Sequence, residues 1–284
     1  MNHLDLRDRL QTHLEHVARE RDPYLATAGH FFVQTYIQTQ LAQWGPVTTF
    51  EFKRPQGTHT NLILALPGRS PSQTDPILIG AHYDAVPGSP GADDNATGVA
   101  VLLELARAIA LAPANYPVWF VAFDLEEHGM VGSAQYAQQL KQQGQALRLM
   151  LSLEMLGYCT QAPNSQNYPT ALLKRIYPTQ GNFIALIGNL TTIPDLHHLS
   201  RACHQAGVPS RWLPAGWRGE VVPAVRLSDH SSFWDQGYRA LMVTDTAFLR
   251  NPHYHQASDR IETLDLDFLT HICVGLLQGI QSLR

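Results

Sequence analysis

Histidines and acidic residues stand at the ends of several apolar runs in this 284-residue chain. The run Ile77 to His82 ends in a histidine, and Asp84 follows two residues later, where its carboxylate could accept a hydrogen bond from the ring. The run Val118 to Asp124 leads directly into Glu126 and Glu127. A histidine oriented by a carboxylate is a common metal ligand, and carboxylates can also transfer protons. Taken alone, each segment could equally be a polar strand end.

Two further acidic segments are harder to explain as ordinary surface. Asp93, Asp94 and Asn95 precede a helix-length apolar segment. One of them could cap that helix, but three candidates are more than one cap needs. Glu154 closes the apolar run Leu149 to Glu154. A carboxylate within such a run is costly to bury unless it is paired or binds a cation.

A fifth segment follows the run Ala240 to Asp245 and contains His253, His255 and Asp259. Ligands of open α/β sheets collect beyond the carboxyl ends of the strands, and all five segments place acids or histidines there. Two imidazoles and several carboxylates, with no thiolate, suit zinc or a similar divalent ion. A set this rich in acids suits two ions that share a bridging carboxylate.

The elements that must position these residues alternate between apolar runs of strand length and amphipathic segments of helix length. This alternation predicts an α/β sandwich built on a largely parallel sheet. No repeat, linker or change of composition marks a boundary, so residues 1–284 are predicted to form one domain. The predicted strands are 61–66, 77–82, 118–124, 149–154, 183–187 and 240–245. The predicted helices are an amphipathic first helix within 1–22, then 31–44, 96–111, 132–143, 194–206, 231–236 and 265–283.

Two stretches, 158–177 and 209–223, are predicted to be long irregular connections. Long loops in compact domains are often functional, so both are candidate walls of a substrate site. Their aromatic residues could line an apolar specificity pocket or simply pack. The aromatic residues in these two stretches are Tyr158, Trp212 and Trp217, and Phe248 in the loop after Asp245 is a fourth candidate.

Composition excludes several classes of protein. With 44% hydrophobic and 15% charged residues, the chain is neither disordered nor a disulfide-stapled miniprotein. A formal net charge of -4 without long charged runs makes nucleic acid an improbable partner. The three cysteines form no CxxC motif. The N-terminus lacks the apolar core of a secretion signal, and no segment is long and apolar enough to span a membrane, so we expect a cytoplasmic protein.

Five ordered segments of the chain resemble the di-zinc exopeptidase family that includes leucine aminopeptidases and aminopeptidase Y, with glutaminyl cyclases as relatives. The segments are GAHYDAVPGSPGADDNATGVAVLLELAR, FDLEEHGMVGS, LSLEMLGY, LSDHSSFWDQG and NPHYHQASD. The resemblance implies a three-layer sandwich with a central mixed, mostly parallel sheet. It also implies a zinc metallopeptidase that acts on peptides with a free N-terminus.

Carried over by position, the resemblance implies that His82 and Glu154 bind one zinc ion and that Glu127 and His255 bind the other. Asp94 would bridge the two ions, and the peptide bond after Asp94 would be cis. The charges agree with this reading, since three carboxylates and a bridging hydroxide balance two Zn²⁺ ions. The family's familiar ligand at the position of Glu154 is an aspartate, so metal affinity or preference could differ.

The resemblance also implies roles around the ligands. Glu126 would be the general base and Asp84 would orient His82, while Ser228 or Asp229 would support the ligands from behind. Arg260 follows Asp259 where the family usually has threonine, which leaves the support of the His255 loop open. The remaining histidines of interest, His253, His13, His16, His197, His198 and His204, are expected to face solvent or to fill helix surfaces.

Three alternative functions remain open. A cyclase-type acyltransferase would act on N-terminal glutamine with a single zinc ion, but the doubled Glu126 and Glu127 favour the peptidase. A catalytically silent binding domain would lose ligands, whereas this chain keeps all five. A carboxypeptidase for acidic peptides would need an arginine cluster, which Arg218, Arg226 and Arg250 could supply.

Overall fold

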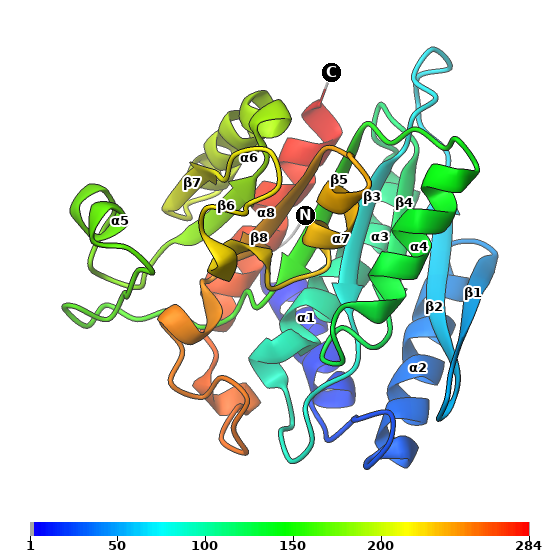
Figure 1. Ribbon diagram of the computed structural model, residues 1–284, viewed down its shortest axis with the longest axis horizontal. Helices are drawn as coiled ribbons and strands as arrows, with labels where there is room; N and C mark the ends of the chain where they lie inside the picture. Colours follow the sequence, from blue (N-terminus) through cyan, green and yellow to red (C-terminus); the bar gives the residue numbers. More distant parts are fainter. Residues whose placement is uncertain (1–2, 284) are drawn as a thin grey trace.

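The computed structural model describes residues 3–283, which fold around one eight-stranded mixed sheet (Figure 1). The strands lie in the order β1-β2-β4-β3-β5-β8-β6-β7. Pairing is antiparallel between β1 and β2, β2 and β4, and β6 and β8, and parallel elsewhere. The strand bounds are β1 Val47–Arg54, β2 Gly57–Leu66, β3 Ile77–His82, β4 Val118–Phe123, β5 Leu149–Glu154, β6 Ile184–Gly188, β7 Ser210–Pro214 and β8 Ala240–Thr244.

Helices cover both faces of this sheet, which confirms the predicted sandwich. One face carries α1 His3–Val17, α2 Thr27–Ala42, α3 Gly98–Leu111, α6 Ile193–Gln205 and α8 Leu266–Ser282. The other carries α4 Val131–Gln142 and α7 His230–Asp235. The shorter helical segments are α5 Ala171–Ile176, η1 Ala92–Thr97, η2 Leu190–Thr192, η3 Pro223–Arg226, η4 Ala247–Leu249 and η5 Ile261–Thr263.

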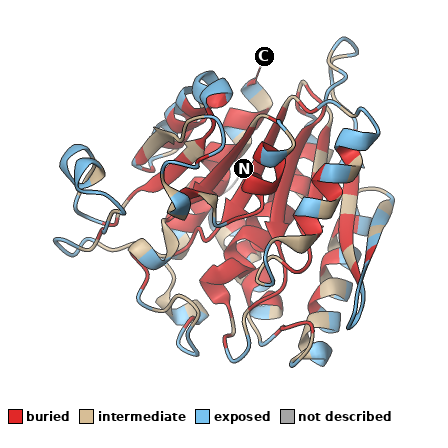
Figure 2. Cartoon of the chain, viewed as in Figure 1, coloured by how far each residue is buried: buried red, intermediate tan, exposed pale blue. Residues whose placement is uncertain are grey.

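Two apolar cores follow from this layering. The larger lies between the sheet and the five-helix face, and the smaller lies under α4 and α7 (Figure 2). Burial follows the period of each element. In α1 every third or fourth residue, Leu6, Leu10, Leu14 and Val17, is fully buried, as expected for an amphipathic helix. In β3 all six residues are buried, as expected for a central parallel strand.

Most predicted elements are present within a few residues of their predicted bounds, and two strands and one α-helix were missed. The runs 77–82 and 149–154 are strands with the predicted bounds. The stretches 158–177 and 209–223, predicted to be irregular, contain α5 and β7 respectively. The edge strand β1 was also not predicted. Its residues are mostly exposed or half-buried, so no apolar run announces it.

The central strands β4, β3, β5 and β8 are adjacent and all parallel. Their carboxyl ends therefore meet at one edge of the sheet. The last residues of these strands and the segments that follow them carry the candidate ligands. The topology alone therefore brings residues that are far apart in sequence to one place.

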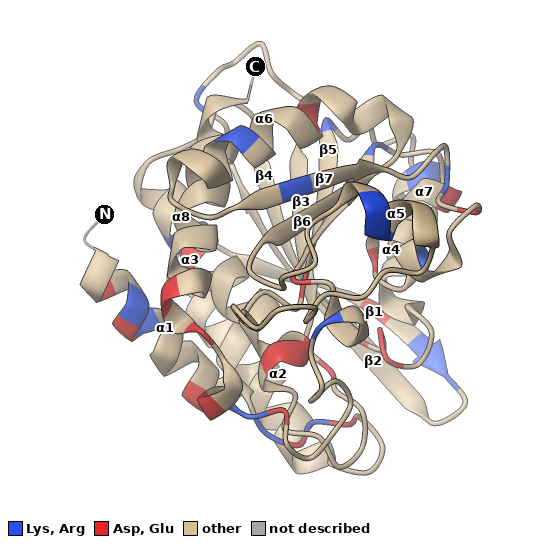
Figure 3. Ribbon diagram, turned by 90° about the vertical axis from the view of Figure 1, so that its left-hand side faces the viewer, with Lys and Arg blue, Asp and Glu red and all other residues tan. Residues whose placement is uncertain are grey.

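The rest of the surface is mixed in charge. In the view of Figure 3, acidic and basic residues are interspersed along α1 rather than gathered in one field. Cys159, Cys203 and Cys273 are free, and the latter two are buried. Among residues 3–283, no helix combines the length and apolar character that crossing a membrane requires.

Candidate metal centre

Asp94 lies between two histidines at the carboxyl edge of the sheet. Its Oδ1 lies 3.3 Å from Nε2 of His82, the last residue of β3. Its Oδ2 lies 3.2 Å from Nε2 of His255, in the loop after β8. The two oxygens of one carboxylate thus face two different imidazoles, which is the arrangement that a bridging ligand requires.

Each histidine also faces a second carboxylate. Oε1 of Glu154, at the end of β5, lies 3.6 Å from His82 Nε2. Oε2 of Glu127, in the turn after β4, lies 3.2 Å from His255 Nε2. His82, Asp94 and Glu127 each offer a ligand atom within 4.8 Å of the others, so a single ion could also use them together.

The donor atoms fit a divalent metal ion. Both ring nitrogens of His82, Oε1 of Glu127 and Nε2 of His255 are buried and have no hydrogen-bond partner among the described residues. Buried polar atoms without partners are rare and call for an explanation, and a bound cation supplies one. Nitrogen and oxygen donors without sulfur are compatible with zinc.

Electrostatics at the ligands also favour a cation. Burial, together with the charge of Asp94, raises the pKa of Glu127 to about 7. Burial alone would lower the pKa of His255, but the carboxylates of Asp94 and Glu127, each 3.2 Å from its Nε2, outweigh burial and raise the pKa to about 10. Protons therefore occupy these ligands readily, and a divalent ion must compete with them.

Asp84 joins two ligand-bearing segments. Its Oδ1 lies 3.3 Å from Nδ1 of His82. Its two oxygens also accept the backbone N-H groups of Glu126 and Glu127, each at 3.1 Å. The residue predicted to orient His82 thus also holds the turn that carries both glutamates.

Glu126 lies beside the ligands without joining either group. Its Oε2 is 4.0 Å from His82 Nε2, and its side chain is 13% exposed. Burial raises the pKa of Glu126 well above its usual value; nearby Glu154 and Asp229 raise it further, and His82 opposes them. A buried carboxylate whose surroundings favour its protonated form is a candidate for general acid-base catalysis.

Ser228 supports Glu154 directly. Its hydroxyl donates to Oε2 of Glu154 at 2.7 Å and lies 2.9 Å from the hydroxyl of Ser152. Asp229 is buried, and its oxygens have no hydrogen-bond partner among the described residues. Burial raises the pKa of Asp229 to about 7. Of the two residues expected behind the ligands, Ser228 is the one that contacts a ligand.

Asp259, in the same loop as His255, contacts the loop that carries Asp94. Its carboxylate accepts the backbone N-H groups of Asp93 and Asp94 at 2.9 and 3.1 Å, so it holds the loop of the candidate bridging residue. The peptide bond between Asp94 and Asn95 is cis, as expected. The side chain of Asn95 accepts the N-H of Met155, which ties this loop to the end of β5.

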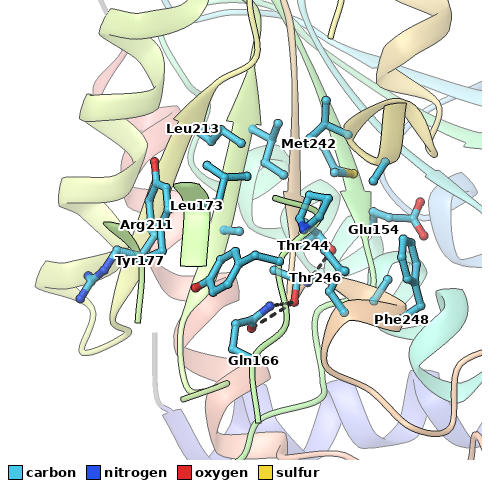
Figure 4. A pocket seen from close by; sticks show the side chains of 18 of the residues that line it. Glu154, Gln166, Leu173, Tyr177, Arg211, Leu213, Met242, Thr244, Thr246 and Phe248 are labelled. Carbon is cyan, nitrogen blue, oxygen red and sulfur yellow. Dashed lines mark hydrogen bonds between the residues drawn. The ribbon is translucent and has the colours of Figure 1, made fainter. Parts of the chain in front are cut away.

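A large pocket opens beside Glu154 (Figure 4). Its total volume is about 850 Å³ including the open mouth, and its walls are mainly apolar. Leu213 and Met242 come from strands, while Leu173 and Tyr177 come from the 158–177 segment. Both stretches expected to form walls, 158–177 and 209–223, contribute to it.

The details of this pocket correct two expectations. Trp212 and Phe248 line the pocket. Tyr158 and Trp217 are not among its lining residues, and Trp217 is 69% exposed. The three arginines proposed for a carboxypeptidase do not line it either. Arg226 is paired with Asp235, and Arg250 is buried with its Nε bonded to Gln166. Arg211, which was not considered, lines the pocket at a distance from Glu154.

The other histidines lie outside the ligand cluster. His197 and His204 are exposed, and His16 and His198 are half-buried. His253 Nδ1 lies 3.0 Å from the hydroxyl of Ser258. The expectation for His13 was wrong, since it is buried beneath α2 with Nδ1 2.8 Å from the hydroxyl of Tyr36.

Sequence reasoning missed Tyr254 and Arg21. The ring of Tyr254 stacks on His255 with centroids 3.7 Å apart and also lines the pocket, so it joins the two parts of the site. Its position next to His255 was the only signal. Arg21 lies directly behind the Asp94 loop, and no local pattern marks it.

The protein family model described as Peptidase family M28 matches residues 61–278. The chain is 35% identical over 259 residues to the uncharacterized protein YfbL of Escherichia coli K12, covering 85% of this chain and 77% of that protein. It is 26% identical over 251 residues to leucine aminopeptidase 1 of Aspergillus oryzae, covering 84% and 59%. The chain therefore spans little more than half of that second relative.

Solved structures share the fold at low sequence identity. LapA aminopeptidase of Legionella pneumophila superposes with a TM-score of 0.74 at 20% identity, over 98% of this chain and 73% of that one. A glutaminyl cyclase of Bacteroides thetaiotaomicron gives a TM-score of 0.69 at 15% identity, over 100% and 98%. Since one fold hosts both activities, the fold does not choose between them.

Proposed function

The chain belongs to peptidase family M28. On that premise we propose that it is a zinc aminopeptidase with two zinc ions and Glu126 as general base. The observation that carries this proposal is the position of Asp94 between His82 and His255. One ion would be held by His82, Asp94 and Glu154, and the other by His255, Asp94 and Glu127.

When bound, the zinc ions lower the pKa of water and polarise the scissile carbonyl group. Glu126 takes a proton from the attacking water and delivers it to the leaving amine. Its carboxylate lies beside the candidate ligands, with Oε2 4.0 Å from His82 Nε2, which suits a group that exchanges protons there without holding an ion. Asp84 keeps Glu126 in place through the backbone N-H of that residue.

The substrate's free α-amino group would lie among the carboxylates of the centre, which attract a cation. The side chain of the substrate's first residue would enter the adjoining pocket, because Glu154 belongs both to the metal centre and to the lining of this pocket. Apolar walls of this size favour a bulky apolar residue such as leucine or phenylalanine over a small or charged one.

A glutaminyl cyclase is the second candidate, because a glutaminyl cyclase shares this fold and three of the candidate ligands could hold a single ion. It would act on N-terminal glutamine with one zinc ion. The trio of His82, Asp94 and Glu127 is compatible with a single ion. The imidazole of His255, which faces the other oxygen of Asp94, favours the two-ion peptidase instead.

A panel of substrates separates these functions. The purified protein, reconstituted with zinc, is tested on 4-nitroanilides of leucine, phenylalanine, alanine and glutamate, on N-acetylated leucine 4-nitroanilide, and on a peptide with N-terminal glutamine. We expect fastest release from leucine or phenylalanine, none from the blocked substrate, and loss of activity with a chelator. Cyclisation of glutamine without release of 4-nitroaniline would establish the cyclase. Inactivity on the whole panel with zinc bound would favour a binding domain.

A further inference from the structure

Arg21 lies behind the candidate metal centre, in the connection between α1 and α2. Its side chain is completely buried. The guanidinium donates to carbonyl oxygens on the loops of two candidate ligands. Nε donates to Tyr83 at 2.9 Å, between His82 and Asp84. Nη1 donates to Pro90 at 2.6 Å, and Nη2 donates to Gly91 at 2.9 Å and to Asp94 itself at 3.2 Å.

The same guanidinium ties these loops to the end of α1. Nη1 also donates to the carbonyl groups of Val17 and Arg19, at 3.2 and 3.1 Å. All six of these bonds go to backbone oxygens, so no carboxylate neutralises Arg21 directly. Burial lowers the pKa of Arg21, and the negative charges of acids in the centre partly oppose this effect. The first of these acids are Asp94, Asp259, Asp84 and Glu127.

Two glycines make room for this arrangement. A Cβ on Gly91 would lie 2.8 and 2.9 Å from the two Nη atoms of Arg21 and 2.2 Å from the carbonyl oxygen of Asp94. A Cβ on Gly29, in α2, would lie 1.9 Å from the carbonyl oxygen of Glu20. The segment that carries Arg21 is thus pressed against α2 on one side and against the Asp94 loop on the other.

The next residue, Asp22, reaches the other ligand-bearing turn. Its Oδ2 lies 3.1 Å from Nε2 of His128, which directly follows Glu127. Its Oδ1 accepts the backbone N-H groups of Tyr24 and Leu25, so the carboxylate is fixed where it stands. Arg21 and Asp22 therefore contact, from one short segment, the loops of both candidate zinc ions.

We propose that Arg21, assisted by Asp22, is a positioning residue that sets the separation of the zinc-binding loops and thereby the zinc affinity. The inference rests on the proposed two-zinc function. Both residues lie outside residues 61–278, the part of the chain that the family model matches. The metal centre of this protein is accordingly completed by an N-terminal segment that touches no metal ion.

The test compares the zinc affinity of folded variants. R21K keeps the positive charge, but a lysine cannot donate hydrogen bonds to all six carbonyl groups. D22N keeps an oxygen that accepts the N-H groups of Tyr24 and Leu25, and it removes the negative charge beside His128. R9K is the matched control, because Arg9 of α1 contacts the buried carboxylate of Glu104 instead of the centre. Zinc affinity is measured by competition with a chromogenic chelator, and the ligand field by the visible spectrum of the Co²⁺-substituted protein.

We expect R21K to bind zinc about 10- to 100-fold more weakly than wild type, as for other residues that hold ligands in place. Its Co²⁺ spectrum should change, and D22N should shift affinity in the same direction. R9K should match wild type in both measurements. If R21K does not fold, as judged by circular dichroism, D22N decides alone.

Wild-type zinc affinity and Co²⁺ spectra in the folded variants, with only a lower melting temperature, would overturn the positioning role and leave Arg21 a stabilising residue. If wild-type protein itself binds no zinc, the proposed function fails and the inference fails with it. These two failures are distinguishable because the wild-type protein is measured first.

Discussion

Glu126 and Glu127 are adjacent in sequence, yet their side chains have different surroundings. Oε2 of Glu127 lies 3.2 Å from a candidate ligand imidazole, while Oε2 of Glu126 comes no closer than 4.0 Å to His82 Nε2. Asp84 holds both residues through their backbone N-H groups, so the two side chains diverge from one fixed turn. This difference in surroundings supports the different roles that we propose for the two residues.

Replacing either glutamate by glutamine should therefore have different consequences. Glu126→Gln keeps the shape but cannot accept a proton, so kcat should fall by about 100-fold or more with both ions retained. Glu127→Gln should weaken one ion, because a neutral amide is a poor ligand. Excess zinc should restore activity at least partly to the second variant only. The kcat and the zinc content of each variant are measured at two zinc concentrations. If both variants keep wild-type kcat and zinc content, the roles proposed for Glu126 and Glu127 are wrong.

His230 predicts a specific loss of stability in acid. It is fully buried with Nε2 2.9 Å from the carbonyl oxygen of Val225, and burial lowers the pKa of His230 to about 3. His230 therefore takes up a proton near pH 6.5 in the unfolded chain but only near pH 3 in the folded chain. The stability contributed by this residue is present above pH 6.5 and falls as the pH falls.

From pH 7 to pH 4 this residue should cost at most about 3 kcal/mol of the free energy of unfolding. The variant His230→Gln cannot titrate, so it should lose less stability over the same range, although it starts lower at pH 7. Urea unfolding of chelator-treated protein at both pH values measures the difference. Equal losses in variant and wild type would show that His230 does not carry the effect.

At the scale of elements, β6 forms part of the floor of the pocket beside the centre. Ala185 of β6 lines this pocket and pairs with Thr244 of β8, so a larger side chain there takes space from the substrate. Ala185→Leu should lower kcat/KM for leucine and phenylalanine 4-nitroanilides by about 10-fold or more, the effect of a few methylene groups in an apolar pocket.

The alanine substrate provides the control for this variant. Its methyl side chain is too short to fill an apolar pocket of this kind, so we expect its kcat/KM to change little and the zinc content to stay the same. A uniform loss for all substrates would instead indicate a disturbed centre. A loss confined to alanine would place the substrate side chain elsewhere.

The elements that the sequence predicted well are those whose residues are buried as a run. Strands β3 and β5 have the predicted bounds because apolar residues begin and end with the strand. The missed β7 is a short edge strand that ends in Pro214 and has four half-buried residues. The missed α5 has no buried residue. Neither element has a period of burial from which it could be recognised.

The candidate ligands were predictable for the same reason that they meet. Each ends or follows a central strand, and parallel neighbours bring their carboxyl ends together. Arg21 and the burial of His13 were not predictable, because both depend on how α1 and α2 pack against the sheet. The acceptance of two backbone N-H groups by Asp259 likewise exists only in three dimensions.

At the scale of the whole molecule, the buried acids of the centre couple zinc binding to stability. Burial raises the pKa of both Glu127 and Asp229 to about 7, so the folded chain holds these carboxylates at a cost. A cation that binds the folded chain offsets this cost. Zinc at about 100 times its Kd should raise the melting temperature by about 5 °C or more.

Metal analysis during the same titration should reach two zinc ions per chain, since five ligands with a shared Asp94 exceed the needs of one tetrahedral ion. Differential scanning calorimetry with zinc or chelator supplies the melting temperatures, and Mg²⁺ serves as the control ion. Saturation at one ion with full activity would support the single-zinc cyclase.

The pocket and the metal centre draw on different stretches of the chain. The pocket is built mainly from residues 166–187, 211–227 and 242–249, whereas most candidate ligands lie earlier, between His82 and Glu154. Glu154 and Tyr254 are where the two sets meet. Related proteins could therefore change the later stretches, and with them the preferred substrate side chain, while they keep the residues of the metal centre.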